Sequence, residues 1–194
     1  MRRATILLAT LALLGVLGVA AALAATAPPK PQVATDAKGD VRSPLDIKRV
    51  SLSRSADGRL RASITLTDPW DAKDLLADSG PPGSVCLKAW TTTAPPDTTP
   101  DYLACATADK DGELRGSILQ ERANKLPART GSADVTRPSD ATVTLRFSQT
   151  AIGKPATLYA AAETTRPGCP RGSCIDLAPD APKTLTLKLQ EPAK

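Results

Sequence analysis

Apolar and polar residues alternate with a period of two along most of this chain. The clearest case lies at residues 58–68, GRLRASITLTD, where every second residue from Leu60 to Leu66 is apolar and the residues between are Arg, Ser or Thr. Successive side chains of a strand point to opposite faces, so this pattern is typical of a strand with one buried face.

The same pattern recurs along the chain, and the turn sequences SADG and DKDG separate neighbouring runs. The inward positions of the other predicted strands are Ile47, Val50 and Leu52; Val85, Leu87 and Ala89; Tyr102, Ala104 and Ala106; Leu114, Gly116 and Ile118; Val143, Leu145 and Phe147; Leu158, Ala160 and Ala162; and Leu185, Leu187 and Leu189. Residues 133–136 are a candidate ninth strand. Short helical turns are expected after Asp71 and between Ser148 and Gly153.

Eight or nine short strands separated by Gly, Pro and Asp predict an all-β protein, an antiparallel β-sandwich of jelly-roll or immunoglobulin-like type. No segment has the length and pattern of the crossover helices that a parallel sheet requires.

The N-terminus has the pattern of a signal peptide. Arg2 and Arg3 precede an uncharged run from Ile6 to about Ala25, and Ala22-Leu23-Ala24 fits the small-x-small cleavage rule. We therefore expect residues 1–25 to be removed and the protein to be secreted. The alternative is an uncleaved membrane anchor, because about 20 apolar residues can span a bilayer.

Cleavage would leave about 168 residues, enough for one domain. The net charge would fall from +5 to +3, and charges of both signs are interleaved without a basic block, so we expect no nucleic-acid partner. Residues 26–39 are predicted to be an exposed, flexible lead-in, and residues 40–190 the sandwich domain.

Four cysteines in an exported chain favour disulfides. Cys86 and Cys105 fall opposite each other if the intervening segment forms a hairpin, which leaves Cys169 to pair with Cys174. A four-thiolate zinc site is the competing interpretation, but C-x2-C spacing and histidine are both missing. A redox-active pair would have C-x-x-C spacing, which the chain also lacks.

Catalytic signals are few. Without histidine the chain lacks the commonest general base, and it has neither a G-x-S-x-G elbow nor a phosphate-binding glycine motif. We expect no enzyme. A small secreted hydrolase using Asp and Glu is an alternative.

Aspartates in two distant segments are candidate calcium ligands, since hard carboxylate oxygens suit Ca²⁺. Asp36, Asp40 and Asp46 lie near the start of the first predicted strand, and Asp176 and Asp180 lie before the last one. These segments would meet if the first and last strands were neighbours. The alternative is a set of turn aspartates facing water. Asp109 to Glu113, DKDGE, is interpreted as a hairpin turn rather than a calcium loop.

The chain has only five aromatic residues, of which Trp70 and Trp90 are candidate ligand contacts. Trp70 follows Pro69 at a strand end, and Trp90 shares a predicted strand face with Cys86 and Lys88. Packing in the core is the alternative role for each ring.

The run GDVRSPLDIKRVSLSRSADGRLRASITL, followed by VCLKAW, DYLACA and VTLRFS, resembles secreted actinobacterial β-sandwich proteins related to family 9 carbohydrate-binding or DOMON-like domains. The resemblance covers about residues 40–189. It implies a β-sandwich that binds sugar, haem or calcium. Because His is absent and Met occurs only at position 1, no haem ligand pair is expected.

Together these features predict a secreted, non-catalytic binding or structural module with no obligatory cofactor. Its partner would be an extracellular glycan or protein. The first alternative is a calcium-stabilised carbohydrate-binding module. Association with a membrane is expected only if the N-terminal segment stays uncleaved.

Overall fold

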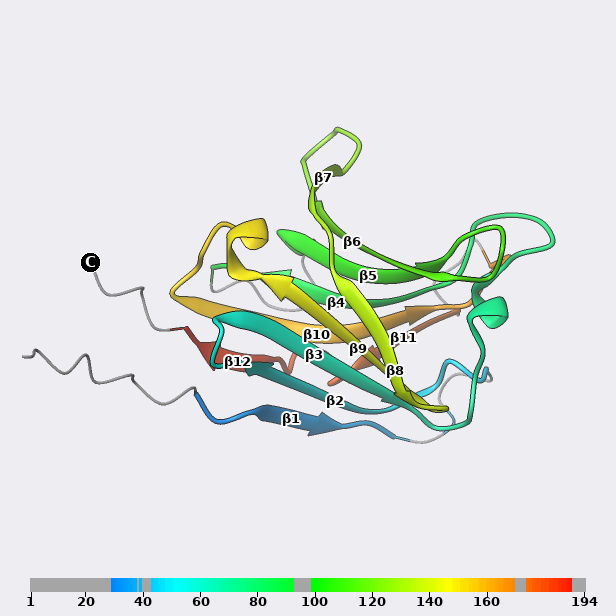
Figure 1. Ribbon diagram of the computed structural model, residues 1–194, viewed down its shortest axis with the longest axis horizontal. Coiled ribbons are helices and arrows are strands. Elements are labelled where there is room, and N and C mark those ends of the chain that lie inside the picture. Colours follow the sequence, from blue (N-terminus) through cyan, green and yellow to red (C-terminus); the bar gives the residue numbers. More distant parts are fainter. Residues whose placement is uncertain (1–28, 38, 40–42, 93–98, 170–173, 190–194) are drawn as a thin grey trace, which may run out of the picture.

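Two antiparallel sheets pack face to face in the computed structural model, which describes residues 29–37, 39, 43–92, 99–169 and 174–189 (Figure 1). The five-stranded sheet has the spatial order β1 (Gln32–Thr35), β2 (Ile47–Arg54), β3 (Arg59–Leu66), β9 (Thr142–Ser148) and β8 (Asp134–Ser139). The seven-stranded sheet runs β11 (Ile175–Ala178), β10 (Thr157–Thr165), β4 (Ser84–Trp90), β5 (Tyr102–Ala108), β6 (Leu114–Gln120) and β7 (Ala128–Gly131), and β12 (Leu185–Lys188) also pairs with β10. The predicted all-β sandwich is confirmed.

The core between the sheets is built from the alternating apolar positions. Leu60, Ile64, Leu87 and Leu145 are fully buried members of one cluster to which both sheets contribute. The sequence pattern therefore predicted correctly which side chains of these strands face inward.

Two turns depend on glycine and aspartate together. Gly58 and Gly112 have φ values of 78° and 79°, which residues with a Cβ rarely adopt. In the second turn, Asp109 Oδ1 accepts hydrogen bonds from the backbone N–H groups of Asp111 and Glu113, both at 3.0 Å. The DKDGE segment is thus a hairpin turn between β5 and β6, as predicted.

The chain passes from one sheet to the other between β7 and β8, and this crossing needs a glycine on β6. A Cβ at Gly116 would overlap the carbonyl oxygen of Ala133, a backbone atom with little freedom to move. This close approach explains why a glycine stands at an inward position between Leu114 and Ile118.

Both predicted helical turns are single turns of 3-10 helix. Asp71 caps η1 (Ala72–Leu75) by accepting from Lys73 N, and Ser148 caps η2 (Gln149–Ile152) by accepting from Thr150 N. Short side chains with an oxygen at the N-cap satisfy backbone N–H groups that have no partner within the helix.

Three strands were not predicted: β1, β7 and β11. Gln32–Thr35, placed by the sequence in the exposed lead-in, pairs with β2 as an edge strand. Ile175–Ala178, placed in a proline-rich loop, pairs with β10. Each is short, and in β1 and β11 the apolar residues Val33 and Ile175 are exposed while Asp176 is buried, so the expected alternation is absent.

Hydrogen bonds of buried polar side chains connect the two sheets at one end of the sandwich. Asp176 of β11 is buried, and its Oδ2 accepts a hydrogen bond from Ile47 N of β2 at 2.5 Å, while Oδ1 accepts from Leu177 N at 2.8 Å. On the neighbouring strand β10, Thr164 is the register partner of Asp176, and its Oγ1 donates to Leu45 O at 2.7 Å. These side chains thus provide hydrogen-bond partners for the backbone N–H of Ile47 and the backbone C=O of Leu45.

Candidate binding surface

The outward side of the five-stranded sheet carries only polar side chains on its three central strands. We call this surface the polar face. The register of the strands places its residues in rows: Ser51, Ser63, Thr144 and Thr136; Arg49, Thr65 and Thr142; Ser53, Arg61, Arg146 and Asp134; and Arg59 with Ser148. Neighbouring strands lie about 4.8 Å apart and alternate residues about 7 Å apart, so the rows form a regular grid.

Hydroxyl groups on the polar face are bonded to one another across the strands. Ser63 Oγ and Thr144 Oγ1 lie 2.9 Å apart, and Thr65 Oγ1 and Thr142 Oγ1 lie 3.0 Å apart. Each bond uses one donor, so each pair keeps a second hydroxyl hydrogen and further lone pairs for another partner. The paired hydroxyls are therefore held in place. Ser63, Thr65 and Thr142 are half-buried and can still donate and accept, whereas Thr144 is buried.

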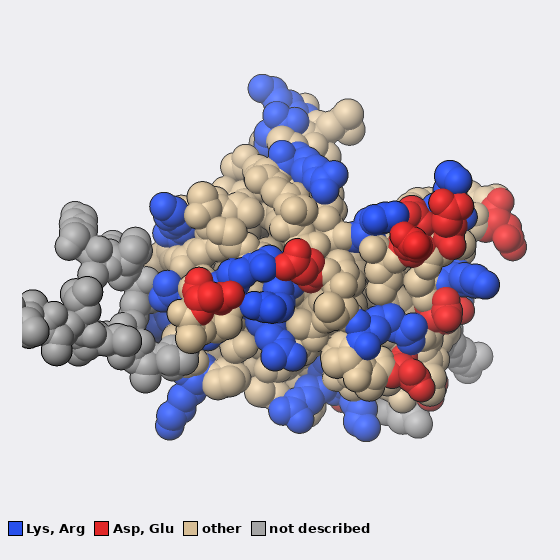
Figure 2. Space-filling view, viewed as in Figure 1, with Lys and Arg blue, Asp and Glu red and all other residues tan. Residues whose placement is uncertain are grey.

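Arginines give the polar face its positive charge. Arg59 pairs with Asp134 at 2.7 Å and donates to Arg146 O at 3.1 Å, and Arg146 pairs with Asp57 at 3.1 Å. Figure 2 shows a group of Lys and Arg side chains near the middle of this view, with acidic side chains on two sides of it.

Two further arginines, Arg49 and Arg61, are exposed and have no ion pair with any described residue. Asp57 is held as a carboxylate: the Ser55 hydroxyl, the Arg59 backbone N–H and the Arg146 guanidinium all lower its pKa. With four arginines and two carboxylates, the face keeps an excess of positive charge.

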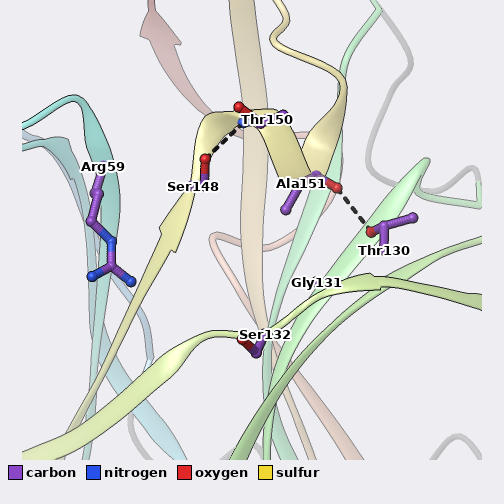
Figure 3. Close-up of a pocket in the computed structure, with 7 residues that line it drawn as sticks. All are labelled: Arg59, Thr130, Gly131, Ser132, Ser148, Thr150 and Ala151. Carbon is purple, nitrogen blue, oxygen red and sulfur yellow. Dashed lines mark hydrogen bonds between the residues drawn. The ribbon is translucent and has the colours of Figure 1, made fainter.

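An open hollow lies at the edge of the polar face, where β3 and η2 approach the chain that leaves β7 (Figure 3). Its volume is about 590 Å³. The lining residues are Arg59, Thr130, Gly131, Ser132, Ser148, Thr150 and Ala151.

Hydrogen bonds shape the wall of this hollow: Thr130 Oγ1 donates to Ala151 O at 2.9 Å, and Ser148 Oγ accepts from Thr150 N at 3.2 Å. A smaller hollow of about 180 Å³ shares Ser148 and Thr150 and adds Arg54 and Lys154. Hydroxyls and cations thus continue from the polar face into both hollows.

Neither tryptophan is available as a ligand contact on the surface of this structure. Trp70 is 4% exposed, belongs to the core cluster, and packs against the Arg137 guanidinium at 4.8 Å from the ring centre. Trp90 is completely buried, although it does lie on the predicted face with Cys86 and Lys88. The alternation of apolar and polar residues predicted correctly on which face of the strand Trp90 lies. It does not indicate whether other parts of the protein cover that face.

Of the candidate calcium ligands, the structure brings together Asp46 and Asp176 at the start of β2. Both are buried and accept backbone hydrogen bonds, Asp46 from Gly39 N and Asp176 from Ile47 N. Asp36 donates its N–H to Lys48 O, Asp180 is exposed, and Asp40 lies outside the described residues. Within the described residues, no group of three or more acidic, cysteine or histidine side chains is placed to hold a metal. The sequence predicted that these two segments could lie close together. In the structure the carboxylates of Asp46 and Asp176 accept hydrogen bonds from backbone amides.

Both cysteine pairs expected from the sequence are present. Cys86 and Cys105 are direct cross-strand partners on β4 and β5, with Cα atoms 4.0 Å apart, and Cys169 and Cys174 have Cα atoms 6.0 Å apart. Such bonds are compatible with an extracellular protein. The predicted signal peptide at residues 1–25 lies outside the described residues.

Among the described residues there is no helix whose length and apolar character would let it cross a membrane. Comparison with protein-family models, curated proteins and solved structures finds no match. The polar face was missed as a site by the sequence analysis, although its signal was present in the Arg, Ser and Thr residues between the apolar positions of residues 59–65 and 142–148.

Proposed function

We propose that this protein is a secreted, non-catalytic binding module and that the polar face is its recognition surface. The observation that carries the proposal is the grid of hydroxyls and arginines on the outward side of one sheet, continued by the hollow beside Arg59. An extended partner could contact several rows at once, which suits a polymer better than a small molecule.

The chemistry of the face favours an acidic polysaccharide. Arg49 and Arg61 offer guanidinium groups without ion pairs to the described residues, and a guanidinium can donate two parallel hydrogen bonds to one carboxylate or sulfate. The serine and threonine hydroxyls between them can exchange hydrogen bonds with sugar hydroxyls. A neutral glycan would use the hydroxyls and leave the arginines without a charged partner.

The face is also largely preorganised. The hydroxyl pair of Ser63 and Thr144 and the bonds of Arg59 to Asp134 and Arg146 exist without a ligand. Groups already held in position lose little conformational entropy on binding, which favours affinity.

The test is affinity electrophoresis of the protein in gels containing polygalacturonate, heparin or neutral dextran. We expect retardation by an acidic polymer, weakening as salt screens the charges, and none by dextran. Combining Arg49→Gln with Arg61→Gln should weaken binding at least tenfold. The matched control combines Lys183→Gln with Lys188→Gln, which removes the same charge away from the face. Equal loss in both double variants, or no retardation by either acidic polymer, would contradict the proposal.

A further inference from the structure

The hairpin of β6 and β7 forms an arm that stands out from the body of the sandwich (Figure 1). Its tip is the loop of residues 121–127, ERANKLP. Leu126 in this loop is 84% exposed, against 45% for Val33 and 40% for Ile175, the other exposed large apolar side chains among the described residues. A single exposed leucine is common on protein surfaces, but this one lies in the loop of a protruding arm together with several cations, and that combination suggests a contact.

The loop is held in shape by its own hydrogen bonds. The Arg122 guanidinium donates from Nε and Nη2 to Leu126 O at 3.0 and 2.5 Å, and Lys125 N donates to Arg122 O at 3.2 Å. Asn124 takes the left-handed conformation, with φ of 57°, which asparagine tolerates better than most residues. At the base, Glu121 N donates to Asp101 O at 2.9 Å. The apolar side chain is therefore presented by an ordered turn.

Three cations lie in or next to the loop that carries the exposed leucine. Arg122, Lys125 and Arg129 lie within seven residues of one another, all are exposed, and none forms an ion pair with a described residue. Glu121, half-buried at the base of the loop, is the one acidic residue of the segment 121–131. Figure 2 shows the cationic side chains around the end of the arm.

We propose that this tip docks onto an anionic lipid surface, with Leu126 entering the interface and the three cations contacting headgroup phosphates. Basic residues near an anionic membrane are attracted to its surface, and an apolar side chain adds the free energy of its burial among the acyl chains. The inference is independent of the polar face, which lies on different strands.

The shape of the tip favours a bilayer over a protein partner. A stable protein interface takes about 20–30 residues from each side, whereas this tip offers a seven-residue loop with one apolar side chain. A lipid surface can accept a single inserted side chain because its molecules rearrange around it. The charge of the tip complements phosphate headgroups without any fixed partner geometry.

The first experiment places a fluorescent reporter at the tip. In Leu126→Trp, added vesicles of equal parts phosphatidylglycerol and phosphatidylcholine should shift the indole emission to shorter wavelength, and vesicles of phosphatidylcholine alone should not. Because the reporter senses only its own position, the reading does not depend on the N-terminal apolar segment. Val33→Trp, an exposed position on β1, is the matched control and should show no shift. No shift at position 126, or an equal shift at 33, would overturn the proposal.

The second experiment measures partition into the same vesicles by flotation, using the chain as the expressing cell processes it. Each of Arg122→Gln, Lys125→Gln and Arg129→Gln should lower the lipid-dependent partition about fivefold, and Leu126→Ser about tenfold. Lys125→Gln and Leu126→Ser change little in the fold because both side chains are exposed, so their loss would report on docking alone. Lys183→Gln is the charge-matched control. Unchanged partition in Leu126→Ser and Lys125→Gln, or an equal loss in the Lys183→Gln control, would refute the docking role of the tip.

Discussion

The outward faces of the two sheets are built from the same alternating pattern and have opposite character. On the five-stranded sheet, the outward side chains are the hydroxyls and arginines of the polar face, and all of them except Thr144 are half-buried or exposed. On the seven-stranded sheet, β4 points Cys86, Lys88 and Trp90 away from the core, yet both Cys86 and Trp90 are buried. Neither belongs to the cluster between the sheets, so this outward face has a small buried layer of its own.

Covalent and ionic links reinforce that second layer. Cys86 and Cys105 are joined across β4 and β5, and Lys88 Nζ pairs with Glu163 Oε2 at 3.0 Å across β4 and β10, with side chains only 17% and 18% exposed. Lys88 also lies 5.8 Å from the centre of the Trp90 ring. The comparison shows that alternation separates inward from outward positions but does not determine whether the outward face is open or covered.

Removing the ring of Trp90 should give the largest difference between the two faces. We expect Trp90→Ala to lower the free energy of unfolding by about 3–5 kcal/mol, because a large buried side chain is lost and a cavity remains. Arg61→Ala, an exposed change on the polar face, should stay within about 0.5 kcal/mol of the wild type. Urea denaturation followed by circular dichroism measures both. Similar losses in the two variants would show that the faces do not differ as described.

Removing the cross-strand disulfide should have the next largest effect. The bond closes a loop with a sequence separation of 19, so Cys86→Ala with Cys105→Ala should cost about 3 kcal/mol in the chain-entropy model. The bond between Cys169 and Cys174, with a separation of 5, should contribute less, about 2 kcal/mol. Thermal unfolding of the two double variants tests the order. A larger loss from the second pair would contradict it.

A smaller effect is expected from the hydroxyl ladder of the polar face. Thr144 is buried on this otherwise open surface and shares a hydrogen bond with Ser63. Thr144→Val keeps the shape and removes the bond, so it should cost about 1 kcal/mol. Thr136→Val, an exposed neighbour in the same row, is the control and should change the stability less. Equal changes in denaturant midpoint would mean that the hydroxyl pair contributes nothing.

The smallest effect concerns the carboxylate of Asp57. Its pKa is lowered from the ordinary value of 3.8 by the Ser55 hydroxyl, the Arg59 backbone N–H and the Arg146 guanidinium. A lowered pKa means that the stabilisation is complete above pH 3.8 and is lost as the pH falls through the lower, folded-state value. The stability difference between wild type and Asp57→Asn should therefore shrink in that acid range. A difference that stays constant down to low pH would exclude this linkage.

The sequence predicts most of the sandwich because a strand with one buried face has apolar residues at every second position. Leu60 and Ile64 fit this pattern and are buried. The pairing of Cys86 with Cys105 could be predicted because a hairpin places them opposite each other. In β1 and β11 the exposed Val33 and Ile175 and the buried Asp176 run against this pattern, so these two edge strands could not be found in this way.

The functional interpretation was harder to obtain from the sequence. Trp90 was placed on its correct face, but its burial depends on tertiary packing outside its own strand. The meeting of Asp46 and Asp176 was predicted as a condition for calcium, while their hydrogen bonds to the amides of Gly39 and Ile47 follow from three-dimensional geometry alone. Arg61 and Ser63 were visible as polar positions, and only the register of β3 with β9 shows that they belong to a grid.

The hydrogen bond from Ile47 to Asp176 has a consequence for the order of folding. It joins residues 129 positions apart, and the nearby bond from Thr164 to Leu45 spans 119. Closing such long loops has a large entropic cost, and chains dominated by distant contacts fold slowly. The N-terminal strands can pair with one another early in folding. The hydrogen bond from Ile47 N to Asp176 can form only after the distant β11 has reached β2. The C-terminal strands therefore close this end of the sandwich late in folding. A chain truncated before Ile175 should lack β11 and β12 and leave the Ile47 amide without this acceptor.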